Sequence, residues 1–121
     1  MTYAYDDSNI FAMILRGEIP NTTVTETDHS LAFRDINPQA PVHILLIPKG
    51  KYVTVDDFAA NASAEETADF WATFAAIIDS EGLRDKGFRV ISNAGDHGLQ
   101  EVPHFHLHIL GGTVLGPLLA R

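Results

Sequence analysis

The segment Pro-His-Phe-His-Leu-His-Ile-Leu-Gly-Gly, residues 103–112, constrains the fold of this chain more than any other. Polar and apolar residues alternate strictly from His104 to Ile109, and successive side chains of a β-strand point to opposite faces of its sheet. The pattern predicts a strand that carries His104, His106 and His108 on one face and three apolar side chains on the other. The proline is tolerated where a strand begins, and the glycine pair ends it.

The residues alone leave three interpretations of these histidines open. A half-buried strand can have a polar face without any function, although threonine, lysine or glutamate is the usual choice for one. Imidazoles two residues apart can share one metal ion. Histidine can also act as a nucleophile or as a general acid and base near neutral pH.

Length and composition limit the classes of function. With 121 residues the chain is expected to form one domain, 1–121. It has no cysteine, so thiol chemistry and disulfides are excluded. A net charge of −8 argues against a nucleic-acid partner, whereas a small phosphate ligand can still be held by backbone N–H groups and imidazoles. No leader pattern and no membrane-spanning apolar stretch is visible, so we expect a cytoplasmic protein without a membrane partner.

The remaining elements follow from capping and periodicity, and the fold class is α+β. We expect an antiparallel sheet of about five strands with one long and one short helix. The expected elements are a short helix over 9–16 capped by Ser8, a hairpin of strands 22–27 and 31–35, a strand over 42–48, a long helix from the Ser63–Glu66 capping box to about Ser80, and a strand over 88–93.

Several features of these elements allow a structural and a functional interpretation. The apolar stripe of the short helix either faces the core or covers a ligand such as a nucleobase. His43, alone in an apolar strand, is either a core histidine or a partner of the cluster. The glycine-bearing loop over 93–98 is a plain connection or a phosphate-binding loop. The aromatic stripe of the long helix is expected to pack on the sheet, and the apolar tail over 113–121 on its own domain or on a partner subunit.

Taken together and in order, these motifs resemble the histidine triad (HIT) family, in its nucleotide-binding branch. The resemblance is carried by Asn9-Ile10-Phe11, by residues 31–43 with the sequence LAFRDINPQAPVH, by Asn93-Ala94-Gly95 and by the histidine strand. It extends over nearly the whole chain and implies a HIT-like fold.

The resemblance also implies roles for individual residues. His106 would be the nucleophile that attacks the α-phosphorus of a nucleotide and forms a covalent nucleotidyl-histidine. His104 and His108 would polarise the phosphate oxygens, and His43 would support them by hydrogen bonding. Asp35 would bind the ribose hydroxyls. The remaining nucleotide-binding residues would be Phe11, Ile14, Phe33, Ile36 and Leu45 around the base and Asn93 near the phosphate and ribose.

One position departs from many members of the family. They carry a small hydroxyl residue after the glutamine, whereas this chain has Gln100-Glu101. Glu101 would either protonate the leaving group as an acid or repel an anionic substrate.

The leading hypothesis is a hydrolase of purine nucleoside 5'-phosphoramidates that releases AMP and an amine, without a metal or other cofactor. The alternatives are a hydrolase of dinucleoside polyphosphates, a nucleotide-binding regulatory module without turnover, and a zinc-binding protein. The resemblance further implies a homodimer that joins through the long helix and a strand.

Overall fold

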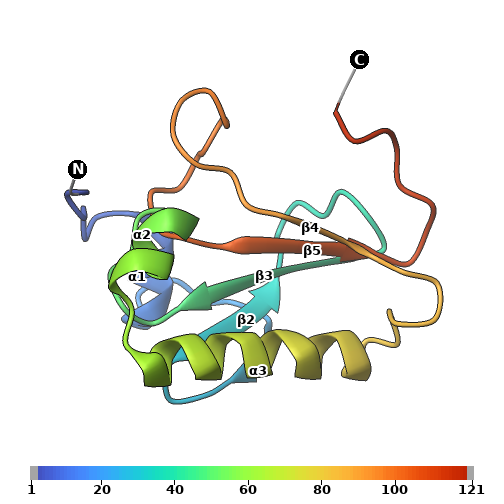
Figure 1. The fold of residues 1–121 in the computed structure, drawn as a ribbon, viewed down its shortest axis with the longest axis horizontal. Helices are drawn as coiled ribbons and strands as arrows, with labels where there is room; N and C mark the ends of the chain where they lie inside the picture. Colours follow the sequence, from blue (N-terminus) through green and yellow to red (C-terminus); the bar gives the residue numbers. More distant parts are fainter. Residues whose placement is uncertain (1–2, 120–121) are drawn as a thin grey trace.

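A five-stranded antiparallel sheet organises the computed structural model, which describes residues 3–119 (Figure 1). The strand order is β1-β2-β3-β5-β4, so β3 and β5 are adjacent in the middle of the sheet. The strands are β1 (Thr23–Glu26), β2 (Ser30–Arg34), β3 (Val42–Pro48), β4 (Arg89–Ile91) and β5 (Leu107–Gly111). The expected α+β fold with its hairpin, its central strand and its five antiparallel strands is confirmed.

Three helices accompany the sheet, one more than expected. They are α1 (Ile10–Leu15), α2 (Val55–Asn61) and α3 (Ala64–Ser80). The α1 cap is Asn9 rather than Ser8, because the Asn9 side chain accepts the Ala12 N–H at 2.9 Å. The α3 capping box is confirmed: Ser63 and Glu66 each bond the backbone N–H of the other. The additional helix, α2, is capped by the Thr54 side chain.

The histidine strand begins later than the alternation predicts. Hydrogen-bonded pairing starts at Leu107, opposite Leu46 of β3. Two of the preceding residues use their N–H groups elsewhere: His104 N–H donates to Val102 O, and Phe105 N–H donates to Tyr52 O. The chain therefore joins the sheet only after Phe105 has bonded this loop.

The sheet has an apolar core on each face. One core lies between the sheet and helices α2 and α3 and contains Phe58, Phe70, Phe105, Leu107 and Ile109. The second lies under α1 and contains Phe11, Leu31, Phe33, Leu45 and Ile47. The apolar residues of the histidine strand therefore face α3, and His106 and His108 lie on the α1 side, on the opposite face as the alternation predicts.

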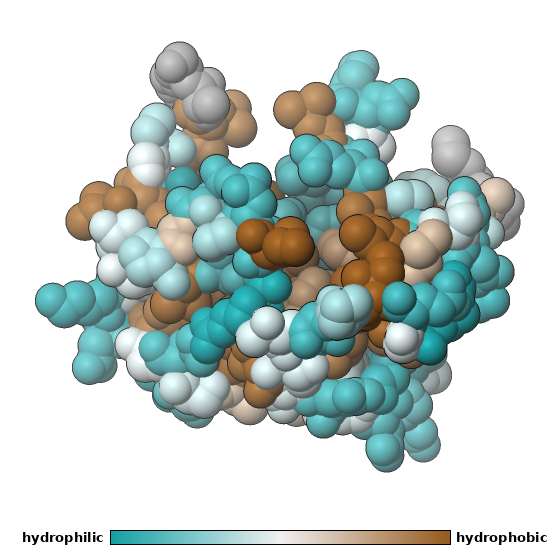
Figure 2. Space-filling model, turned by 180° about the vertical axis from the view of Figure 1, so that it is seen from behind, coloured by the Kyte–Doolittle hydropathy of each residue, from teal (hydrophilic) through white to brown (hydrophobic). Residues whose placement is uncertain are grey.

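Some large apolar side chains remain outside both cores, and brown patches interrupt the hydrophilic surface in Figure 2. Trp71 of α3 is 45% exposed, so the expectation that the whole aromatic stripe packs on the sheet is wrong for this residue. In the tail, Val114, Leu118 and Leu119 are exposed and do not pack on their own domain. Residues 120–121 of that tail lie outside the described residues.

A search of residues 3–119 finds no helix that is both long and apolar enough to cross a membrane.

Candidate active site

A cavity of about 760 Å³ lies beside the histidines, and we call it the histidine cavity. Its walls come from α1, from β2 and β3, and from the loop between β4 and β5. Every residue predicted for the site lines it except His104. The predicted residues in its lining are Phe11, Ile14, Phe33, Asp35, Ile36, His43, Leu45, Asn93, Glu101, His106 and His108.

His106 is held in one tautomer by the backbone. Its Nδ1 lies 2.7 Å from the carbonyl oxygen of His104. A carbonyl oxygen only accepts hydrogen bonds, so Nδ1 carries the proton and Nε2 keeps its lone pair. The edge of the Phe11 ring packs against the imidazole, with the centroids 4.9 Å apart. Burial lowers the pKa of His106 from its ordinary value of 6.5. A neutral imidazole with a free Nε2 is a nucleophile that is ready at pH 7.

His108 takes the complementary tautomer through a chain of hydrogen bonds that also begins at the backbone. The Gln39 N–H donates to His43 Nδ1 at 3.0 Å, so His43 carries its proton on Nε2. That Nε2–H donates to His108 Nδ1 at 2.9 Å. His108 is thereby left with a proton on its own Nε2 and lines the cavity as a hydrogen-bond donor. Burial lowers the pKa of His108 to about 4, so the ring is neutral.

Asp35 lies beside His43, the middle member of this chain. Its Oδ2 is 3.3 Å from His43 Nε2, and its Oδ1 accepts the Asn37 N–H at 2.8 Å. Asp35, His43 and His108 offer ligand atoms within 4.8 Å of one another, which makes them the candidate metal group. However, two nitrogens bound to one tetrahedral zinc stand about 3.3 Å apart. The 2.9 Å separation of the two histidines fits a hydrogen bond better than a shared ion.

His104 occupies a different position from the one expected for a phosphate contact. Its side chain is 0% exposed. The Nε2–H donates to Pro48 O at 2.8 Å, and Nδ1 accepts the Tyr5 hydroxyl at 2.6 Å. Both ring nitrogens are therefore occupied within the protein, and the role in polarising phosphate is corrected. What His104 supplies is its carbonyl oxygen, which orients His106.

The inner wall of the histidine cavity is apolar. Phe11 and Phe33 meet edge to face, with ring centroids 5.6 Å apart, and Leu45 packs with them. Ile36, on the loop after β2, is fully exposed at the rim. Such a wall accepts a flat, apolar group such as a nucleobase.

The loop between β4 and β5 also lines the cavity, through Asn93, Leu99 and Glu101. Its ends are tied together by Gln100, whose side chain accepts the Gly95 N–H and donates to Val53 O and Val102 O. Backbone bonds that link Asp96 to Leu99 and Gly95 to Gln100 close the turn. Asn93 and Glu101 are candidate site residues from the sequence, whereas Leu99 was missed.

Tyr5 and Gln39 were missed as well. Tyr5 bonds His104 from a distant part of the chain, and Gln39 bonds His43 through its backbone N–H. No local sequence pattern indicates contacts of this kind.

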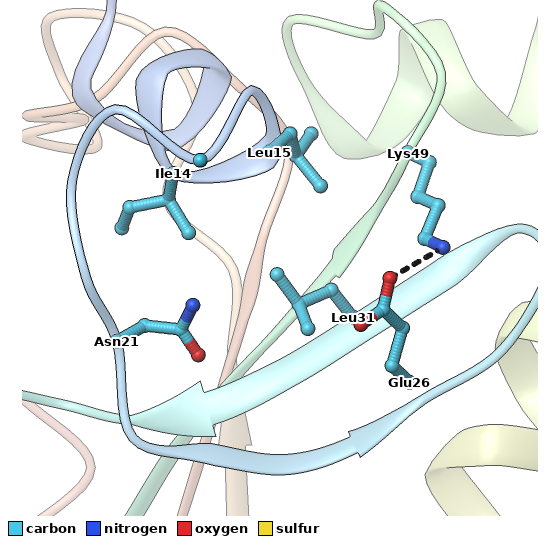
Figure 3. Close-up of a pocket in the computed structure, with 7 residues that line it drawn as sticks. Ile14, Leu15, Asn21, Glu26, Leu31 and Lys49 are labelled. Atoms are coloured by element: carbon cyan, nitrogen blue, oxygen red, sulfur yellow. Dashed lines mark ion pairs between the residues drawn. The ribbon is translucent and has the colours of Figure 1, made fainter.

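A second, smaller cavity of about 350 Å³ lies beside α1 (Figure 3). Its floor contains Ile14, Leu15 and Leu31, and its rim carries an ion pair between Lys49 and Glu26 at 2.7 Å. None of its lining residues is a nucleophile or a general base at neutral pH, apart from the paired Glu26. The histidine cavity is therefore the candidate active site.

This chain is similar to several known proteins over most of its length. The HIT domain family matches residues 16–114. The purine nucleoside phosphoramidase of Escherichia coli strain K12 is 47% identical over 116 residues, covering 95% of this chain and 96% of that protein. The adenylylsulfatase HINT1 of Arabidopsis thaliana is 44% identical over 112 residues, covering 88% and 73%. A HIT family hydrolase from Legionella pneumophila Philadelphia 1 has a TM-score of 0.81 at 42% identity, covering 90% and 96%.

Proposed function

We propose, because this chain belongs to the HIT domain family, that it hydrolyses the P–N bond of purine nucleoside 5'-phosphoramidates. The products are a nucleoside monophosphate such as AMP and a free amine. The relative named purine nucleoside phosphoramidase, at 47% identity over almost the whole chain, supports this substrate class.

The observation that carries the proposal is the tautomer of His106. Its Nδ1–H is bonded to His104 O, so the free lone pair belongs to Nε2 at the cavity. In the first step, Nε2 forms a bond to the α-phosphorus while the bond from phosphorus to the amine breaks. The electron pair of that bond stays on the amine nitrogen, which takes a proton. In the second step, water attacks the phosphorus and the bond to His106 breaks.

Charge that develops on the phosphate oxygens needs a fixed donor. The Nε2–H of His108 is such a donor, because the bond from His43 leaves it no other tautomer. It requires no metal ion and no prior protonation. Asn93, in the same lining, is proposed to contact the phosphate and ribose.

The nucleoside is proposed to occupy the inner side of the cavity. The base would lie against the apolar wall made by Phe11, Ile14, Phe33, Ile36 and Leu45. Asp35, with its Oδ1 and Oδ2 already oriented by Asn37 and His43, is proposed to accept the ribose hydroxyls.

Glu101 is proposed as the general acid for the leaving amine. It lines the same cavity as His106, so it is within the site where the amine leaves. It would give its proton to the amine in the first step and recover one from water in the second.

The decisive experiment measures AMP release from adenosine 5'-phosphoramidate in chelator-treated buffer. We expect turnover by the wild type and a loss of at least about 10³-fold in kcat for His106→Asn, because the covalent step is removed. The His97→Asn variant, which removes an exposed histidine outside the cavity, is the matched control and keeps wild-type activity.

Other outcomes would assign a different function. Nucleotide binding without turnover would identify a regulatory module, and turnover of diadenosine polyphosphate alone would identify a polyphosphate hydrolase. Activity that the chelator abolishes would contradict metal-free catalysis.

We also propose that the chain, as a single domain, forms a homodimer through α3 and the outer edge of β4. Trp71 and Phe74 of α3 and Phe88 before β4 form a continuous aromatic row, with successive centroids 5.8 and 6.1 Å apart. Trp71, Phe88 and Val90 are exposed along it. Within residues 3–119, β4 pairs with β5 alone, so its outer edge is available to another strand.

A further inference from the structure

Leu99 has a backbone conformation that its side chain does not favour. Its φ is 58°, and it is the one non-glycine residue in the described part of the chain with a positive φ. Glycine, asparagine and aspartate enter this left-handed region readily, whereas a bulky side chain there is strained. Strain of this kind concentrates at functional sites and persists where the surroundings impose it.

The loop holds its shape without the Leu99 side chain. Gln100 ties the two ends of the loop, and the Leu99 N–H donates to Asp96 O at 3.1 Å. The turn is tight, because a Cβ on Gly98 would lie 2.5 Å from Ala94 O. By contrast, the Leu99 side chain is 78% exposed and belongs to neither core. The fold therefore gains nothing from a leucine at this position, and asparagine would suit the backbone better.

The side chain does have a place in the histidine cavity. It lines the cavity together with Glu101 and Asn93, on the wall formed by the loop. The proposed nucleoside uses the apolar wall on the α1 side and Asp35. The loop wall carries one carboxylate and one exposed leucine that this assignment of the nucleoside does not use.

We propose that Leu99 is a specificity-determining residue that contacts the leaving amine, so that the preferred substrates are phosphoramidates whose amine carries an apolar substituent. This inference rests on the proposed function. The P–N bond breaks with its electron pair on the amine nitrogen, and the nitrogen takes its proton near Glu101. The carbon chain attached to that nitrogen then lies against Leu99 and is removed from water.

The test compares two substrates that differ only in the amine: AMP linked to methylamine and AMP linked to n-hexylamine. We expect the wild type to favour the hexylamine compound in kcat/KM by about tenfold, the low end of what a single methylene contributes in an apolar pocket, because the exposed Leu99 covers the chain on one side only. Leu99→Asn, which is similar in size but polar, is expected to abolish this ratio. Leu99→Met, which restores an apolar side chain, is expected to retain it.

Two controls separate specificity from folding. Leu118→Asn makes the same replacement at an exposed leucine that does not line the cavity, and it is expected to keep the wild-type ratio. The thermal midpoint of Leu99→Asn is expected to be no lower than that of the wild type, because asparagine adopts the left-handed region more readily than leucine.

Each remaining outcome overturns the inference in a recognisable way. Equal kcat/KM for the two substrates, or a Leu99→Asn variant that keeps the preference, shows that Leu99 does not contact the leaving group. A Leu99→Asn variant with the wild-type ratio but an altered oligomeric state assigns the residue to a contact between copies of the chain. Hydrolysis of neither substrate means that the proposed function has failed and that this inference falls with it.

Discussion

His43, His104, His106 and His108 owe their tautomers to backbone groups. Pro48 O and His104 O select the tautomers of His104 and His106, and the Gln39 N–H selects those of His43 and His108. The sequence predicts which histidines gather, because a strand has a period of two. It does not predict their tautomers or the position of His104, because these depend on a carbonyl of β3 and on a tyrosine 99 residues away.

Because of the buried histidines, we expect the free energy of unfolding to depend on pH. Burial lowers the pKa of folded His104 to about 4, whereas an unfolded histidine has a pKa of 6.5. Between these values the unfolded chain binds more protons, so the stability contribution is complete above pH 6.5 and is lost as the pH falls towards 4. We expect His104 alone to lower the free energy of unfolding by roughly 2 kcal/mol between pH 7.5 and 5.0.

Urea denaturation at the two pH values measures this difference. The His97→Asn variant, in which an exposed histidine is replaced, is expected to show the same loss as the wild type. A loss below about 0.5 kcal/mol would contradict the burial of a neutral His104.

The sequence predicts best the elements that are determined by caps and apolar patterns within their own residues. The capping box and apolar period of α3, and the apolar run of β3, are confirmed with boundaries close to the expected ones. The missed helix α2 also has a local indication, since Thr54 caps Asp57 in the same way as Ser63 caps Glu66. The late start of β5 has no local indication in the sequence, because it depends on the hydrogen bond from the Phe105 N–H to Tyr52 O.

The α3 cap gives a prediction at this scale. Ser63→Ala removes the oxygen that accepts the Glu66 N–H at 3.1 Å. We expect a loss of about 1 kcal/mol in the free energy of unfolding, measured by urea denaturation at pH 7.5. Ser80→Ala at the other end of α3 is the matched control, with an expected change within about 0.5 kcal/mol. Equal effects of the two substitutions would show that the cap does not stabilise the helix.

At the scale of the whole molecule, the proposed dimer predicts a mass of twice 13.2 kDa in light scattering after size-exclusion chromatography. Trp71→Glu places a charge in the aromatic row between α3 and β4, and we expect it to weaken association by at least about 30-fold. Val55→Glu, at an exposed apolar position on α2, is the matched control and is expected to remain dimeric. A monomeric wild type at micromolar concentration would refute the proposed interface.

The alternation of the histidine strand also separates two kinds of evolutionary change. Phe105, Leu107 and Ile109 belong to one core, while the proposed nucleophile lies on the other side of the same backbone. Under the proposed mechanism, a substitution at His106 removes the covalent step and leaves the core against α3 intact. A hydrolase of this kind and a nucleotide-binding protein without turnover would then differ by one substitution.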